Sequence, residues 1–153
     1  MATYSKIMLA MDMVSKSYDN YVNAKTELDY ISSILLSGAS LGIIQPLIRE
    51  RGGKSFHKIL ETLMKRITLN DRDIKAHEGV FRQTYNSIKH AGNVRQNILP
   101  SDDLYINTNF KKEASRMLKA CKEDFLKLNS CDVPGASCLP IDFVEFLENI
   151  NIA

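Results

Sequence analysis

Apolar residues recur at helical spacing along most of the chain, and no run of β-branched residues alternates as a half-buried strand would. The first 37 residues contain neither glycine nor proline. Gly38 and the small residues around it predict the first break, because glycine is unfavourable inside a helix. Before that break, spacing of i, i+4, i+7 and i+11 predicts a buried stripe formed by Ala24, Leu28, Ile31 and Leu35.

Five further segments follow the helical pattern. We expect one or two short helices in 39–51 before the Gly-Gly pair at 52–53, an amphipathic helix at 54–68, helices at 73–91 and from about 110 to 129, and a short one at 141–150. Asn70 or Asp71 and residues 107–109 are candidate helix caps, because their side chains accept free first-turn N–H groups. The long helix is expected to turn one set of side chains inward: Phe110, Ala114, Met117, Cys121, Phe125 and Leu128.

Four to five main helices with short connections predict an all-α, up-and-down antiparallel bundle, with a short C-terminal helix in addition. We expect the bundle to span residues 1–130. Residues 131–153 are expected to form a turn-rich linker and an amphipathic helix that packs on the bundle.

Composition places the chain among globular proteins, because 44% hydrophobic and 25% charged residues exclude a disordered chain. A net charge of +2 gives no global argument for nucleic acid. The charges are nevertheless uneven. Residues 49–66 carry six Lys or Arg against two Glu, and residues 82–95 carry three without an acid, so the middle of the chain is basic.

The cysteines and histidines show no zinc-binding spacing. The N-terminal segment lacks the basic region and the cleavage site of a signal peptide, and no apolar stretch approaches the roughly 18 residues of a membrane span. These features predict a cytoplasmic protein with reduced thiols and with neither a cofactor nor a membrane segment. His57 is interpreted as a surface residue and His77 as a core residue.

The stretch YNSIKHAGN, residues 85–93, ends the helix predicted at 73–91. On a helical wheel its polar residues converge on one side, and Tyr85 lies at the edge of the apolar side. Two interpretations stay open: a solvated face with His90 near the negative end of the helix dipole, or a site that holds a phosphodiester. The polar stripe comprises Arg82, Asn86, Lys89, His90 and Asn93.

Residues 18–129 resemble the HEPN superfamily, small all-helical proteins of prokaryotic toxin–antitoxin and phage-defence systems. The resemblance lies in long helices, a helix that ends in Asn-x3-His, a loop and another long helix. Active HEPN ribonucleases carry an Arg, often a polar residue such as Asn, and a His four to six residues beyond the Arg. Asn86 and His90 match two of these positions, whereas Tyr85 takes the place of the Arg and Arg82 is the nearest arginine, so the motif is degenerate.

The resemblance implies a metal-independent endoribonuclease or a degenerate RNA binder that works as a homodimer. Its implied partners are RNA and a cognate antitoxin or another defence-system protein. A histidine can act as base or acid, and an arginine can stabilise the phosphorane. A non-catalytic protein–protein interaction or regulatory module is the alternative. The expected catalytic residues are His90, Arg82 and Asn86, and the expected substrate-binding residues are Lys89, Tyr85, Asn93 and Arg95.

Overall fold

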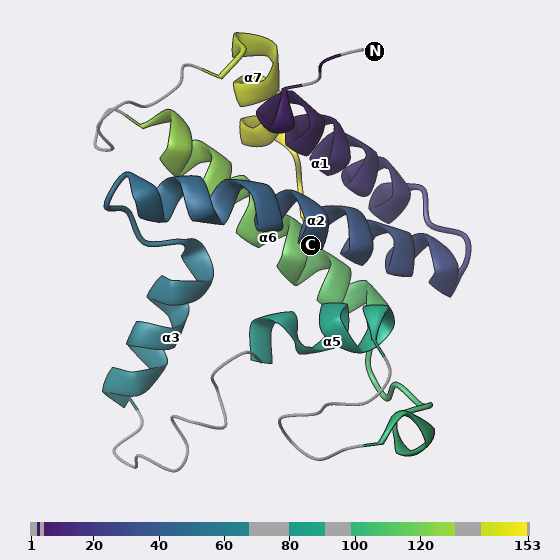
Figure 1. Ribbon diagram of the computed structural model, residues 1–153. Helices are drawn as coiled ribbons and strands as arrows, with labels where there is room; N and C mark the ends of the chain where they lie inside the picture. Colours follow the sequence, from purple (N-terminus) through teal and green to yellow (C-terminus); the bar gives the residue numbers. More distant parts are fainter. Residues whose placement is uncertain (1–2, 4, 68–79, 91–98, 131–138, 153) are drawn as a thin grey trace.

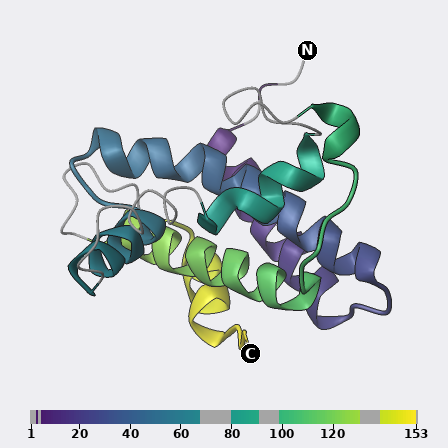
Figure 2. The ribbon, with the colours of Figure 1, turned by 90° about the horizontal axis from the view of Figure 1, so that it is seen from below.

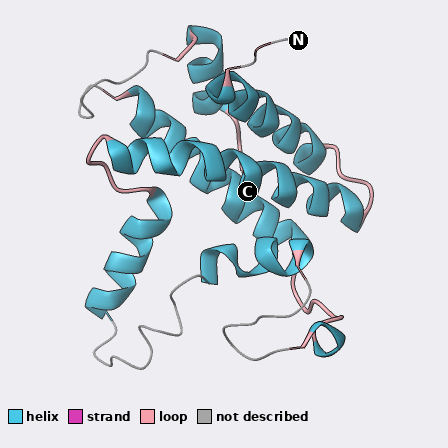
Figure 3. Cartoon of the chain, viewed as in Figure 1, coloured by secondary structure: helices cyan, strands magenta, loops and turns pink. Residues whose placement is uncertain are grey.

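The computed structural model shows an all-α helical bundle, as the hydrophobic pattern predicted, and describes residues 3, 5–67, 80–90, 99–130 and 139–152. Within these ranges every regular element is a helix (Figure 3). The elements in chain order are α1 (Lys6–Val22), α2 (Glu27–Glu50), α3 (Phe56–Ile67), α5 (Val80–Lys89), the short 3-10 helix η2 (Pro100–Asp102), α6 (Phe110–Asn129) and α7 (Ile141–Asn149) (Figure 1).

Helix α2 is the centre of the bundle and packs against both α1 and α6 (Figure 1). It begins at a capping box in which Thr26 is the N-cap and Asp29 accepts a hydrogen bond from the Thr26 N–H at 2.9 Å. The Thr26 side chain in turn accepts from the Asp29 N–H. These two reciprocal bonds satisfy N–H groups that have no partner inside the helix. Helix α5 lies across α2 beside α6 when the bundle is seen from below (Figure 2).

The break predicted at Gly38 is wrong, because α2 continues through Gly38, Gly42 and Pro46. The chain turns earlier, between Val22 and Glu27. The glycine at position 38 has a tertiary role instead. A Cβ atom there would overlap the ring of Tyr85 in α5, so glycine allows this ring to lie directly on the backbone of α2.

The buried stripe predicted from the sequence is also wrong. Ala24 precedes α2, Leu28 is 67% exposed, and Ile31 and Leu35 are only half-buried. Apolar residues occur on all sides of α2, so their spacing predicts a helix but not which side is buried. The fully buried apolar side chains of α2 are Ile34, Leu41, Ile44 and Ile48.

Helix α2 ends where the Gly-Gly pair predicted. Arg51 is its C-cap, and Gly52 adopts a φ of 80°, a left-handed conformation that glycine takes without strain. The Gly53 N–H then donates to the Ile48 carbonyl at 2.8 Å, which satisfies one of the last helix carbonyls. This tight turn places the start of α3 beside the end of α2.

The long helix predicted from about 110 to 129 is confirmed as α6. Its N-cap is Asn109, whose side chain accepts from the Lys112 N–H at 2.9 Å. The inward set is confirmed too: five of the six side chains are buried, and Phe110 packs against the core. Helix α7 lies on the bundle, since Leu147 is fully buried and the rings of Phe143 and Phe125 are 5.0 Å apart.

By length and composition alone, α2 is long and apolar enough to span a membrane, which differs from the sequence expectation. Half of that apolar segment is buried inside the protein. Its buried face packs on α1 and α6, and this packing accounts for the apolar character of that face.

Candidate functional site

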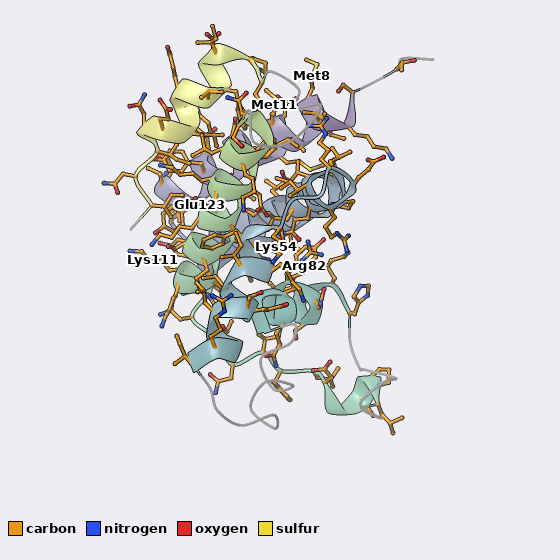
Figure 4. All side chains as sticks on the ribbon, turned by 90° about the vertical axis from the view of Figure 1, so that its left-hand side faces the viewer. Met8, Met11, Lys54, Arg82, Lys111 and Glu123 are labelled. Carbon is orange, nitrogen blue, oxygen red and sulfur yellow. The ribbon has the colours of Figure 1, made fainter. Side chains whose placement is uncertain are left out.

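A cleft of about 620 Å³ opens between α2, residues 53–55, the start of α3 and α5. Its walls carry one acidic side chain, Glu61, which pairs with Lys58 at 3.2 Å. The excess of positive charge favours an anionic ligand. Two of the basic side chains that line this cleft, Lys54 and Arg82, are labelled in Figure 4. The four basic lining residues are Arg49, Lys54, Lys58 and Arg82.

A chain of hydrogen bonds leads from this cleft into the core. Arg82 Nη2 donates to Gln45 Oε1 at 2.8 Å, and Gln45 Nε2 donates to Asp124 Oδ2 at 2.9 Å. The other carboxylate oxygen of Asp124 accepts from the Phe56 N–H at 2.6 Å. We call these three side chains the Asp124–Gln45–Arg82 chain. It connects α6, α2 and α5, and it also holds the first turn of α3.

Asp124 lies at the inner end of this chain and is fully buried. Burial raises the pKa of its carboxyl group, while the hydrogen bonds from Gln45 and the Phe56 backbone act in the opposite direction. The carboxylate also meets the positive end of the α3 dipole. Asp124 thereby supplies an acceptor for two buried donors that would otherwise be costly to leave unpaired.

His57 lies in the cleft wall with only 8% of its surface exposed, so its interpretation as a surface residue is wrong. Its Nδ1 is 3.4 Å from Gln45 Nε2. Burial lowers the pKa of His57 to about 4, and the charges of Arg82 and Arg116 act in the same direction. The imidazole is therefore neutral near neutral pH.

The predicted catalytic residues occupy different surroundings within one chain. Arg82 lies in the cleft and contacts Gln45. Asn86 and His90 are exposed, and the His90 N–H donates to the Asn86 carbonyl at 2.9 Å as part of the helix. Neither of them lines the cleft that contains Arg82 and His57.

The predicted substrate-binding residues divide in the same way. Tyr85 packs against the core on Gly38, and Lys89 Nζ lies 4.9 Å from the centroid of its ring, a cation–π geometry. Tyr85 therefore fixes α5 on α2. Asn93 and Arg95, like His77, lie outside the described residues.

Sequence reasoning missed Gln45, His57 and Asp124 as site residues. For Gln45 and Asp124, the pattern of apolar and polar residues does contain a signal. Gln45 lies within the uncharged segment 30–48, and Asp124 lies on the inward side of α6, three residues after Cys121. A strongly polar residue on an apolar face is rarely buried unless it has a partner, so each of these positions indicates a polar contact in the core.

The cleft offers mainly hydrogen-bond donors to a ligand. Guanidinium and ammonium groups donate only, and a neutral histidine donates through one ring nitrogen. Such a set suits the oxygens of a phosphate, for which arginine also has a matching planar geometry.

Comparison with known proteins assigns no family, because no family model, no curated protein and no solved structure matches the chain. The functional argument therefore rests on the site and on the residues that form it.

Proposed function

We propose that the protein is a HEPN-like RNA-binding protein that holds phosphodiester groups of RNA in the cleft between α2, α3 and α5. The observation that carries this proposal is the gathering of Arg49, Lys54, Lys58 and Arg82 around one cleft, where Arg82 is held in place by Gln45. Basic side chains supply most of the affinity of proteins for nucleic-acid backbones. The resemblance to HEPN proteins is the reason to choose RNA among polyanions.

In this proposal the cleft binds RNA and does not cleave it. Cleavage without metal needs a base for the 2′-hydroxyl and an acid for the leaving 5′-oxygen. A side chain performs these tasks best when its pKa is close to the working pH. The pKa of His57, lowered to about 4, makes it a weak base near neutral pH. Arg82 and the lysines are suited to hold a phosphate.

The test is fluorescence anisotropy of a labelled single-stranded RNA at several salt concentrations. Removal of one phosphate contact lowers the slope of log affinity against log salt by about 0.7 for a single strand. We expect this decrease for Lys54→Ala and for Arg82→Ala. Lys111→Ala is the matched control, because Lys111 is exposed at the start of α6 and lies outside this cleft (Figure 4). Equal effects of Lys54→Ala and Lys111→Ala would contradict the proposal.

The other candidate function is metal-independent cleavage of RNA at a second site, which would include Asn86 and His90. Asn86 in α5 and His90, the residue after this helix, are both exposed and four positions apart, as a site completed by a second copy of the chain requires. The assay is incubation with structured RNA in the absence of metal. We expect His90→Ala to abolish any cleavage, whereas equal cleavage by wild type and variant would point to contamination or another site. Light scattering that shows a strict monomer at micromolar concentration would contradict the dimer.

A further inference from the structure

We infer that Asp124 is a positioning residue for the cleft: through Gln45 it determines both the placement of the Arg82 guanidinium and the tautomer of His57. The first effect matters for RNA binding, and that part of the inference rests on the proposed function. The second is a property of the folded protein alone.

The argument begins with the side-chain amide of Gln45, which has an accepting end and a donating end. An ionised Asp124 only accepts, and Arg82 only donates. Just one orientation of the amide satisfies both neighbours, with Nε2 toward Asp124 at 2.9 Å and Oε1 toward Arg82 at 2.8 Å. The reverse orientation would set donor against donor at one end and acceptor against acceptor at the other.

The orientation of Asp124 itself is held by the backbone. Its Oδ1 accepts from the Phe56 N–H at 2.6 Å, which leaves Oδ2 for Gln45. Full burial of Asp124 and 92% burial of Gln45 keep competing water away from these bonds. The backbone of α3 therefore fixes Asp124, Asp124 fixes the orientation of the Gln45 amide, and the Gln45 oxygen accepts from Arg82.

The same orientation sets the protonation of His57. Gln45 Nε2 has two hydrogens, one directed to Asp124 and the other available to His57 Nδ1 at 3.4 Å. Because the Gln45 Nε2 cannot accept a hydrogen bond, His57 Nδ1 must be the acceptor. The proton of the neutral imidazole then resides on the Nε2 of His57. His57, a neutral residue of the cleft wall, is thus held in one tautomer by Gln45.

Two variants separate positioning from general packing. In Asp124→Asn the new amide keeps its oxygen on the Phe56 N–H and presents its NH₂ to Gln45. Gln45 must then reverse, which turns its own NH₂ toward Arg82 and its oxygen toward His57. In the double variant Asp124→Asn/Gln45→Glu, the introduced carboxylate accepts from both the new amide and Arg82, so the placement of Arg82 is restored while His57 Nδ1 still faces an acceptor.

The first measurement is the histidine tautomer by ¹⁵N NMR at neutral pH, without RNA. We expect the Nε2–H tautomer in the wild type and the Nδ1–H tautomer in both variants. Wild-type protein with the Nδ1–H tautomer, or a tautomer unchanged in both variants, would overturn the inference. If Asp124→Asn alone does not fold, the tautomer of His57 is measured in the double variant, in which every donor of the Asp124–Gln45–Arg82 chain has an acceptor.

The second measurement is affinity for the labelled single-stranded RNA. Loss of one charged hydrogen-bonding contact corresponds to about a tenfold weaker affinity, which we expect for Asp124→Asn. The double variant should recover to within about threefold of wild type. Failure to recover, at an unchanged melting temperature, would overturn the role of Asp124 in placing Arg82. If the wild type does not bind RNA at all, the proposed function fails, and the tautomer still decides the positioning of His57.

Discussion

Helix α2 contains two buried polar clusters of different kinds. Toward α1, the Ser17 hydroxyl donates to the Ser33 carbonyl at 2.8 Å and lies 2.6 Å from the Ser37 hydroxyl. About two to three turns further along α2, the Asp124–Gln45–Arg82 chain connects a carboxyl group to a guanidinium group. Both clusters lie in the core of the same bundle. One is neutral and closed on itself, whereas the other leads to the wall of a cleft.

The difference shows what each cluster contributes. The three serines satisfy one another and a helix carbonyl without any charge, so they allow α1 and α2 to approach closely at little cost in desolvation. Cys121 beside them is neutral as well: burial raises the pKa of its thiol, and its Sγ donates to the Ser37 carbonyl at 3.4 Å. Buried charges cost more than apolar residues of the same volume would. A charged cluster that reaches a cleft therefore indicates function rather than stability.

The largest effect is expected for Asp124→Ala. The substitution leaves the Phe56 N–H and the Gln45 amide without their acceptor in the core. Removal of one partner from a buried charged network costs about 3–5 kcal/mol in the free energy of unfolding. Urea unfolding of the variant and the wild type measures this loss of free energy. Glu123→Ala is the matched control, because this neighbouring acid of α6 is exposed and should cost within about 0.5 kcal/mol (Figure 4). Similar costs for the two variants would contradict a contribution of the Asp124–Gln45–Arg82 chain to stability.

The next effect is a loss of stability in acid caused by His57. Its pKa falls from the ordinary 6.5 to about 4 on folding, so the unfolded chain binds the extra proton between these values. The stability is fully present above pH 6.5 and is lost as pH falls to about 4, by about 3 kcal/mol. The raised pKa of Asp124 acts in the opposite direction, so a variant is needed to isolate His57.

That variant is His57→Asn, whose amide oxygen reaches the position of Nδ1 and keeps an acceptor for Gln45. Urea unfolding at several pH values between 4 and 7 compares it with the wild type. We expect the difference in unfolding free energy between the two proteins to change by about 3 kcal/mol across this window. A difference that does not change with pH would show that His57 titrates normally in the folded protein.

The spacing of apolar residues predicted the helical class, the bounds of α6 and its inward side chains, because these depend on local periodicity and on a cap at Asn109. It did not predict which side of α2 is buried, since an apolar helix has no preferred side until its neighbours are placed. Gly38 predicts a break because glycine is unfavourable inside a helix, whereas its packing partner, Tyr85, is 47 positions further along the sequence and leaves no local signal.

The site was less accessible to sequence reasoning for the same reason. Arg82 is a candidate from the sequence, but its hydrogen-bond partner is Gln45 of α2, which in turn contacts Asp124 of α6, rather than a residue in the polar stripe of its own helix. Asp124 and Gln45 are 79 positions apart, and no local pattern pairs them. The roles of Asn86 and His90 stay predictions, which the cleavage assay addresses.

The smallest effect is expected in the neutral cluster, where Ser17→Ala sharpens the contrast with Asp124. The Ser33 carbonyl belongs to α2, so it keeps its helical hydrogen bond when the Ser17 hydroxyl is removed, and the two remaining hydroxyls can bond each other or nearby carbonyls. We expect a loss of about 1 kcal/mol in the free energy of unfolding, the ordinary value of one neutral hydrogen bond.

Ser17→Ala/Ser37→Ala should cost no more than the sum of the two single changes, because removing both partners leaves fewer unpaired groups. Urea unfolding at pH 4 and pH 7 gives both results. The cost should be equal at the two pH values because no group of this cluster titrates between them, and a loss above about 3 kcal/mol would place the serines in the same class as the charged chain.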